Sequence, residues 1–287
     1  MELIDTHAHL DYPDYAPDLE SVITRAREAG VTKIISIGTG IESSRRAVAL
    51  AGRFENIFAV IGVHPANVIK EGLGFLPELR DLARHPKVVA LGETGMDYYH
   101  VPEELKMADS TTNLEASFQC QSAGDQERLI NEGAWKAAQA DAFAMQLDLA
   151  VELGLNVVIH QRSSWEDTLG VLRPYSGKVR GVFHCFGGTV AEAAELLAIG
   201  HLVSFTGIIT FKNAAQVRET AAAVPDDGYM VETDCPYLAP VPFRGKRAEP
   251  AHTRLVAQEI AEARIVTLEE VAAATTRTAE AFFRFHR

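Results

Sequence analysis

The chain alternates between short, almost wholly apolar runs and longer segments in which apolar residues recur every three or four positions. The short runs lack the polar alternation of a half-exposed strand, so they predict strands buried on both faces. The longer segments have the period of amphipathic helices. Eight strands are predicted at residues 1–4, 33–38, 57–62, 88–92, 156–159, 181–183, 201–205 and 228–231. The predicted helices are 18–29, 41–51, 75–83, 138–153, 164–172, 190–199, 214–223 and 253–263, with two further short helices in the tail at 268–285.

Strands that alternate with helices predict an α/β protein with a parallel sheet covered on its faces. Eight such units favour a closed (β/α)8 TIM barrel, and a doubly wound open sheet is the alternative. Polar residues follow six of the eight predicted strands. A barrel gathers the C-terminal ends of its strands around one mouth, whereas an open sheet spreads them along a line. We therefore predict a barrel that forms a single domain over residues 1–287.

The connection after the fourth predicted strand is unusually long. It spans about residues 100–137 and is rich in Ser, Gln, Asn and acidic residues, with few apolar anchors. A connection of this length in a compact domain is commonly a lid, a binding loop or a disordered insert. Its acidic residues would repel a polyanion lying across the mouth. One hypothesis is that the insert keeps long duplexes out, and the alternative is an insert without a role.

Composition narrows the class of protein. With 47% hydrophobic and 23% charged residues, the chain can bury a full core. No run of 18 apolar residues and no basic-then-apolar start is present, so neither a membrane span nor a signal peptide is expected. Three scattered cysteines, Cys120, Cys185 and Cys235, do not form a disulfide framework, which fits the reducing cytoplasm. A monomer is the default expectation.

The formal net charge is −12. Nucleic-acid binding normally depends on Lys and Arg side chains that meet phosphates, and an acidic surface offers no such general attraction. The charge therefore argues against a protein that coats DNA. It does not argue against an enzyme that takes the end of a strand into a metal site.

The candidate chemistry begins at the first predicted strand. His7 and His9 stand two positions apart, so their imidazoles project to the same side of an extended segment. Ligand-type residues recur after later strands, at Glu93, His160, His184 and Asp234. Each histidine alone would more often be a hydrogen-bonded structural residue. Four imidazoles and two carboxylates at equivalent barrel positions instead predict a mixed N/O site for two divalent cations, which can activate a water for hydrolysis.

Longer motifs surround these residues. They are Asp5-Thr6-His7-Ala8-His9-Leu10, Gly62-Val63-His64-Pro65, Gly92-Glu93-Thr94-Gly95-Met96-Asp97, Val158-Ile159-His160-Gln161-Arg162, Phe183-His184-Cys185-Phe186, Ser204-Phe205-Thr206-Gly207, Glu232-Thr233-Asp234-Cys235-Pro236 and Arg244-Gly245-Lys246-Arg247. With these motifs in this order over nearly its whole length, the sequence resembles the TatD family of metal-dependent hydrolases, within the amidohydrolase-like barrels.

The resemblance implies a role for each candidate residue. One metal ion would be held by His7, His9, Glu93 and Asp234. The second would be held by Glu93, His160 and His184, so that Glu93 bridges the two ions. The catalytic residues would be Glu93 and Asp234, and the contacts to substrate phosphate would be His64 and Arg162. For Arg162 the alternative is an ion pair at the barrel rim, and Glu232 could orient a metal ligand.

The resemblance also implies an activity, namely hydrolysis of phosphodiester bonds by a deoxyribonuclease that trims DNA from a strand end in the 3′ to 5′ direction. Three alternatives stay open: a D-aminoacyl-tRNA deacylase, a cyclic-amide hydrolase, and a metal-bound barrel that only binds a partner. The metals could be Mg, Mn, Zn, Co or Ni, because histidine-rich sites favour the later metals and the family is described with magnesium. Three residues depart from the family pattern, namely Gln161, Ala248 and Thr278, and none of them is an expected ligand.

Overall fold

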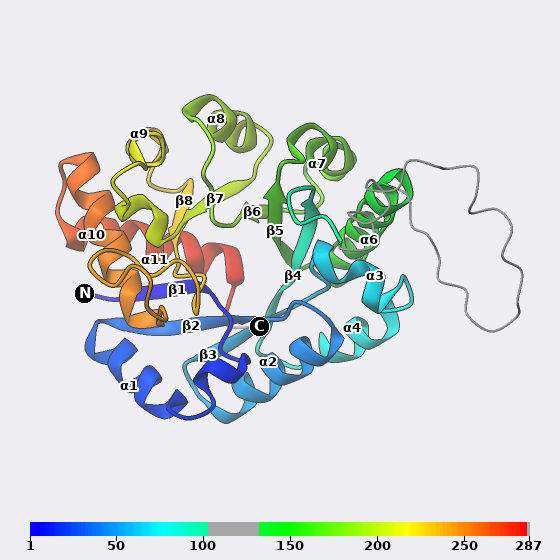
Figure 1. Cartoon of the computed structure of the whole chain (residues 1–287), viewed down its shortest axis with the longest axis horizontal. Helices are drawn as coiled ribbons and strands as arrows, with labels where there is room; N and C mark the ends of the chain where they lie inside the picture. The colour runs from blue at the N-terminus through cyan, green and yellow to red at the C-terminus, as the bar shows by residue number, and fades with distance from the viewer. Residues whose placement is uncertain (103–131, 286–287) are drawn as a thin grey trace, which may run out of the picture.

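The computed structural model describes residues 1–102 and 132–285, and it confirms the predicted barrel. Eight parallel strands pair in chain order, each with the next, and helices surround them (Figure 1). The strands are β1 (Leu3–Ala8), β2 (Val31–Ile37), β3 (Ile57–Ile61), β4 (Val88–Asp97), β5 (Asn156–Arg162), β6 (Gly181–Phe183), β7 (Leu202–Phe205) and β8 (Tyr229–Val231).

The helices are α1 (Leu19–Glu28), α2 (Ile41–Arg53), α3 (Val68–Glu71), α4 (Leu76–Leu82), α6 (Glu132–Leu153), α7 (Trp165–Leu172), α8 (Val190–Ala198), α9 (Ala215–Ala223), α10 (Thr253–Arg264) and α11 (Leu268–Phe283). Most of the helices follow the predicted segments, whereas α3 was not predicted and α6 and α11 differ from the prediction. Short 3-10 helices are η1 (Pro13–Tyr15), η2 (Pro65–Asn67), η3 (Arg173–Tyr175), η4 (Gly207–Thr210) and η5 (Pro250–His252). Among the described residues, no helix combines the length and apolar character needed to cross a membrane.

The predicted insert at about 100–137 is too long at its C-terminal end. Helix α6 already begins at Glu132, and Trp135 within this first part of the helix is buried. Burial of that indole explains why a segment that looks polar overall starts a helix here. Residues 103–131, and with them the hypothesis that the insert keeps long duplexes out, lie outside the described residues.

The barrel closes between its last and first strands just beyond the end of β8. The backbone N–H of Asp234 donates to the carbonyl of His7 at 2.8 Å, and the N–H of His9 donates to the carbonyl of Cys235 at 2.8 Å. The Thr6 hydroxyl adds a bond to the carbonyl of Val231 at 3.1 Å. These bonds hold Asp234 against the histidine pair, although the sequence separates them by most of the chain.

Two strands carry an extra residue near the mouth of the barrel. From Asp5 to Ala8, β1 advances three residues while β2 advances two, from Ile34 to Ser36. The same irregularity occurs in β4 between its pairings with Val157 and Ile159 of β5. Such bulges twist the strand and re-aim the side chains at the irregular position.

Strands 1, 4 and 5 all run beyond their predicted ends. For β5, which continues to Arg162, no bulge is involved, but bulges accompany the extension of the other two. Strands 1 and 4 were expected to end at Ile4 and Gly92, so that His7 and Glu93 would follow them. Instead β1 runs to Ala8 and β4 runs to Asp97, so both functional side chains lie inside strands. The polar residues at the bulge break the apolar run, and this break has the same pattern as a strand end.

The interior of the barrel is apolar toward the N-terminal ends of the strands. Inward-facing aliphatic side chains of the strands pack there with Phe282 and Phe283 of α11. The helix is tied to strand starts, since Asn156 at the start of β5 donates to the carbonyl of Phe282 at 2.6 Å. In the view of Figure 1, α11 lies behind the strands. It therefore forms the floor of the barrel and leaves the opposite end as the mouth.

The tail prediction of two short helices in 268–285 is wrong, because α11 is one continuous helix. Its middle contains Thr275, Thr276 and Thr278, and β-branched residues lower intrinsic helix propensity. In the structure the Thr275 and Thr278 hydroxyls donate to carbonyls of the preceding turn at 2.9 and 3.0 Å. Packing of the phenylalanines on the barrel floor overrides the weak local preference.

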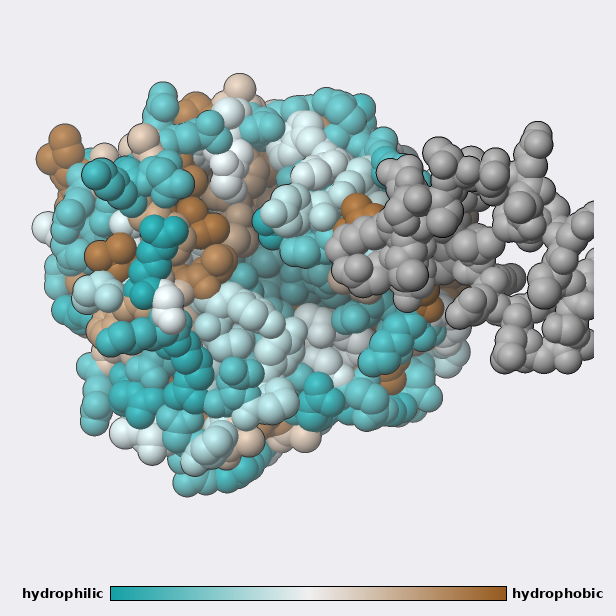
Figure 2. Space-filling model, viewed as in Figure 1, coloured by the Kyte–Doolittle hydropathy of each residue, from teal (hydrophilic) through white to brown (hydrophobic). Residues whose placement is uncertain are grey.

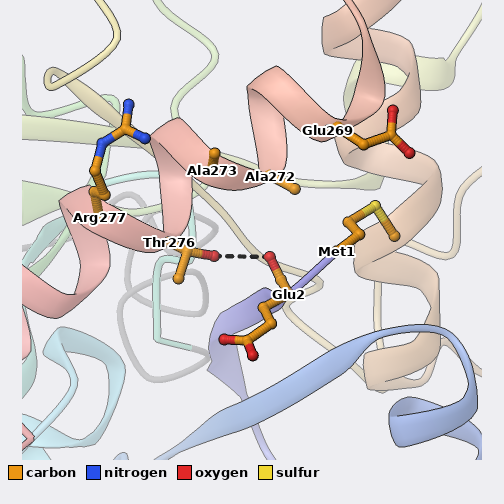
Figure 3. Close-up of a pocket in the computed structure, with 7 residues that line it drawn as sticks. All are labelled: Met1, Glu2, Glu269, Ala272, Ala273, Thr276 and Arg277. Carbon is orange, nitrogen blue, oxygen red and sulfur yellow. Dashed lines mark hydrogen bonds between the residues drawn. The ribbon is translucent and has the colours of Figure 1, made fainter.

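A pocket of about 290 Å³ lies at the floor end, between the first residues of the chain and α11 (Figure 3). The Thr276 hydroxyl donates to the carbonyl of Glu2 at 2.9 Å across it. Ala272 and Ala273 supply part of its lining. None of the predicted site residues lines this pocket, so the chemistry must be sought at the mouth.

The floor packing gives a stability prediction. Phe282→Ala removes a fully buried ring from the barrel interior, and the expected loss in the free energy of unfolding is about 3–5 kcal/mol. Glu280→Ala on the same helix, whose side chain is half exposed and pairs with Lys33, should cost less than about 0.5 kcal/mol. Urea unfolding measures both. Similar losses in the two variants would mean that α11 is not part of the core.

Candidate metal centre

One group of ligand-type side chains forms where β1 and β8 meet. His7 and His9 direct their Nε2 atoms toward each other, 3.3 Å apart. Asp234 Oδ1 lies 3.3 Å from His9 Nε2 and 3.7 Å from His7 Nε2. Both histidines are buried and the Asp234 side chain is 16% exposed. These three residues could hold one cation, and we call them the β1–β8 group.

A second group forms across β4, β5 and the end of β6. Glu93 Oε1 lies 2.8 Å from His160 Nδ1 and 2.7 Å from His184 Nε2. The two imidazole nitrogens are themselves 3.0 Å apart. We call His160 and His184 the β5–β6 group. Its ligand atoms converge on one carboxylate oxygen, so this group could hold a second cation.

Glu93 joins the two groups through different oxygens. Its Oε2 faces the β1–β8 group, 3.4 Å from His7 Nε2 and 3.9 Å from His9 Nε2. Its Oε1 faces the β5–β6 group at the shorter distances given above. A carboxylate whose two oxygens address two separate sets of imidazoles has the arrangement of a bridge between two cations. The six predicted ligands are thus all brought together.

The remaining ring nitrogens indicate which atoms are free to bind a cation. His9 Nδ1 lies 3.3 Å from the carbonyl of Ile37, and His160 Nε2 lies 3.1 Å from Asp97 Oδ2. Each of these nitrogens must carry a hydrogen to satisfy its acceptor, so the other nitrogen presents a lone pair to the centre. Outer partners of this kind fix the orientation of metal-binding histidines.

His184 lies near a buried carboxylate, Glu232, which directly follows β8. The Nδ1 of His184 lies 3.6 Å from Glu232 Oε1. Glu232 is itself fixed, because it accepts from the Cys185 N–H at 2.7 Å and from the Ser204 hydroxyl at 2.6 Å. The structure therefore places Glu232 where the sequence suggested, behind a ligand rather than among the ligands.

The β1–β8 group has the spacing of ligands that share one divalent cation. Ligand atoms that share a cation at about 2.0–2.1 Å lie about 3.3 Å apart in a tetrahedral site. The separations within the β1–β8 group are 3.3, 3.3 and 3.7 Å. Imidazole lone pairs that face one another at such distances repel unless a cation or proton lies between them. A mixed set of neutral nitrogens and carboxylate oxygens suits Zn, Mn, Co or Ni.

The buried carboxylates carry the negative charge that cations require. Burial acts to raise the pKa of Glu93, but the neighbouring imidazoles, His184 first among them, hold that pKa well below its ordinary value. Burial also acts to raise the pKa of Asp234, and the contact with His9 outweighs it, so this pKa is lowered. Both groups are therefore ionised at neutral pH and can bind cations.

By position His64 could join Glu93 and His160 around a cation, but its hydrogen bonds indicate another role. Its Nε2 is 3.5 Å from Glu93 Oε1, while its Nδ1 accepts from the N–H of Ala66 at 3.1 Å. The acceptor role of Nδ1 puts the ring hydrogen on Nε2, so the atom that faces the centre is a donor. Burial lowers the pKa of His64 to about 3, which keeps the ring neutral. A neutral N–H donor suits a substrate oxygen.

Arg162 lies further from the ligands. It ends β5, and its guanidinium lies over the Tyr99 ring at 3.9 Å from the ring centroid. Within the described ranges, no carboxylate lies within 4 Å of it, so the rim ion pair considered from the sequence is not found there. The side chain is exposed, with its charge open to a ligand.

Two buried acidic residues near the centre, Asp97 and Asp5, were not predicted from the sequence. Asp97 accepts from His160, and also binds the His100 ring at 2.6 Å. Asp5 accepts from the Thr233 N–H at 2.9 Å and from the Thr233 hydroxyl at 2.7 Å, next to Asp234. The available signal was spacing: Asp97 stands four positions after Glu93, and Asp5 two positions before His7. The bulges in β1 and β4, however, interrupt the regular alternation that would have assigned either acid to the face of its neighbour.

Fold and site together define a class of protein. Enzymes with the TIM-barrel fold carry their active sites at the C-terminal ends of the strands, where this cluster lies. Buried histidines and carboxylates at that position are the ligands of catalytic divalent metals. The chain is a metal-dependent hydrolase of the barrel type.

Comparison with known proteins gives the family. A family model described as TatD related DNase matches residues 4–284, and the chain belongs to the TatD family, which confirms the resemblance of the motifs. The "uncharacterized metal-dependent hydrolase YabD" of Bacillus subtilis is 35% identical over 285 residues, covering 99% of this chain and 100% of its own. The "3'-5' ssDNA/RNA exonuclease TatD" of Erwinia amylovora is 31% identical over 291 residues, covering 98% and 99%. The crystal structure of YJJV, a TatD homolog from Escherichia coli, superposes with a TM-score of 0.82 at 27% identity over 98% of each chain.

The contact between Asp97 and His160 gives a prediction. If this carboxylate orients His160, Asp97→Ala should weaken metal binding roughly ten- to a hundredfold. Asp81→Ala, which removes an exposed carboxylate on α4, is the matched control and should leave metal affinity unchanged. Titration of metal-stripped protein against a competing chelator measures both affinities. An unchanged affinity in Asp97→Ala would remove this carboxylate from the orientation of the site.

Proposed function

We propose that this protein hydrolyses phosphodiester bonds and removes nucleotides from the 3′ end of a DNA strand. The observation that carries the proposal is the position of the Glu93 carboxylate. One of its oxygens faces the β1–β8 group and the other faces the β5–β6 group. A relative is named a 3'-5' ssDNA/RNA exonuclease, which supports the choice of bond and direction. Two cations a short distance apart are suited to in-line displacement at phosphorus.

In this proposal His7, His9, Glu93 and Asp234 hold one divalent cation, and Glu93, His160 and His184 hold the other. When bound, the cations would polarise the scissile phosphate and lower the pKa of an attacking water. The nitrogen-rich set favours Zn, Mn, Co or Ni, while Mg prefers oxygen ligands.

Asp234 is the candidate general base. It is ionised at neutral pH, lies against His7 and His9, and keeps some exposure. A carboxylate in that position can accept the proton that the attacking water loses. Its backbone is held by the bond to the His7 carbonyl, and its Oδ1 lies 3.3 Å from His9 Nε2.

His64 and Arg162 are the candidate phosphate contacts. The Nε2–H of His64 adjoins the β5–β6 group and can donate to a non-bridging oxygen. Arg162 offers a planar fork of donors, and stacking on Tyr99 limits its rotation. The donors of Arg162 and His64 attract phosphate locally on a chain whose net charge is −12. A strand end needs only such a local site, whereas a long duplex would also meet the acidic surface around it.

The test is reconstitution of metal-stripped protein with one metal at a time. The substrates are single-stranded DNA labelled at either end, duplex DNA, RNA, an aminoacyl-tRNA and dihydroorotate. We expect loss of nucleotides from the 3′ end of the single strand with at least one metal. Hydrolysis of the ester or of the cyclic amide alone would contradict the proposal.

The bridge gives the next prediction. Glu93→Gln keeps the shape of the side chain but loses the charge that holds two cations together. Metal content should fall below two per chain, and activity should fall at least about a hundredfold. Glu78→Gln, an exposed residue of α4, is the control and should retain both. Full activity with two metals in Glu93→Gln would contradict the bridge.

The separation of binding from chemistry gives another prediction. Arg162→Ala should raise KM roughly ten- to a hundredfold and leave metal content unchanged, because one charged contact to phosphate is lost. Asp234→Asn should instead lower kcat by about a hundredfold or more. Steady-state kinetics with metal analysis distinguishes the two variants. Equal loss of metal in both would mean that Arg162 supports the structure.

A further inference from the structure

A second hollow of about 350 Å³ lies between the segments that follow β6, β7 and β8. Its walls come from these three loops and from the start of α9, and in a barrel such loops share the mouth face. Gly187 lies three residues beyond His184, and Leu238 lies four beyond Asp234. The N–H of Val241 donates to the Thr210 hydroxyl at 2.9 Å and joins two of the walls. We call this hollow the side groove.

Aromatic rings line the approach to the side groove. Phe211 is one of its lining residues, and the Arg244 guanidinium lies over this ring, 4.4 Å from the centroid. Tyr237 is 54% exposed and Phe243 is 37% exposed. The Tyr237 ring is 6.5 Å from that of His9, and Tyr237 directly precedes Leu238 of the groove lining, so this wall leads back to the metal centre. Figure 2 shows hydrophobic surface along one side of the hydrophilic hollow at the centre of this face.

The same loops present cations without acidic partners. Lys212, Arg244 and Lys246 are exposed, and no carboxylate of the described residues lies within 4 Å of them. Arg247 next to them is instead paired with Asp18. These three side chains give the surface around the groove a local excess of positive charge, although the net charge of the chain is −12. Their arrangement suits a ligand that is planar and apolar in one part and anionic in another.

We propose that the side groove is a subsite for a nucleotide of a single-stranded polynucleotide, a nucleotide next to the one held at the metal centre. This deepens, and rests on, the proposed function. The base stacks on the free face of the Phe211 ring, and its phosphate is bound by Arg244 and the flanking Lys212 and Lys246. Stacking on aromatic and guanidinium planes is how single strands are held without readout of sequence. A base paired within a duplex has no free face to offer.

The first experiment measures binding without hydrolysis. Metal-stripped protein is titrated into a fluorescent oligothymidylate in the presence of chelator, and anisotropy gives Kd. Phe211→Leu keeps an apolar side chain at this half-buried position but removes the ring, and it should weaken binding roughly tenfold. On an abasic strand of the same length, the two proteins should bind alike. An unchanged Kd for the oligothymidylate in Phe211→Leu would overturn the subsite.

The second experiment tests the cation. Arg244→Gln should reduce the slope of log K against log salt by about 0.7, the loss of one phosphate contact on a single strand. Arg84→Gln is the matched control, because Arg84 is 79% exposed and precedes β4 at the floor end. It should leave the slope unchanged. Equal slopes in Arg244→Gln and the unmodified protein would overturn the role of Arg244.

The two proposals fail in different ways. If the metal-loaded protein cleaves no phosphodiester but Phe211→Leu and Arg244→Gln still weaken binding as expected, the nuclease assignment fails and the side groove stands. If the protein trims single strands with a KM that neither variant changes, the nuclease assignment stands and the side groove fails.

Discussion

Two backbone hydrogen bonds between the ends of the first and last strands are the constraint on which the site depends. They join Asp234 to His7 and His9 to Cys235, each at 2.8 Å. The barrel closes through them, and the same bonds set the spacing between one carboxylate and two imidazoles. Because they lie beyond the end of β8, they act at the mouth and not in the apolar floor. The same two hydrogen bonds therefore close the barrel and bring the residues of the β1–β8 group together.

The bonds alone would leave the side chains pointing along the regular faces of the strands. The extra residues in β1 and β4 lie at His7 and Glu93, and such bulges re-aim the side chains at the irregular position. Close approach of β4 to β5 completes the geometry. Gly95 adopts φ +135°, and a Cβ there would lie 2.0 Å from the carbonyl of His160. Only a glycine permits these two strands to come together at the level of Glu93.

Burial of so many ionisable groups is costly unless each has a partner of opposite charge. Here every carboxylate at the centre meets an imidazole, and Asp97 and Glu232 stand behind the ligands. Histidine suits this role because it is neutral when a cation is bound and can carry a proton when none is. The carboxylates of the folded protein therefore have a partner of opposite charge both with and without bound cations. The floor, held by Phe282 and Phe283, supplies stability that does not depend on the metal centre.

Features that depend on periodicity, such as most helix bounds, could be predicted from the sequence. Features that depend on contacts between distant parts of the chain could not. Helices α7, α8 and α9 differ from their predicted bounds by one residue at one end, because amphipathic spacing is a local property. The bulge at Glu93 was invisible, since a polar residue inside a strand has the same pattern as a strand end. The tail was divided because Thr275 and Thr276 are poor helix formers, and only their packing shows the helix to be continuous. Asp97 was overlooked because its role exists only where β4 and β5 run side by side.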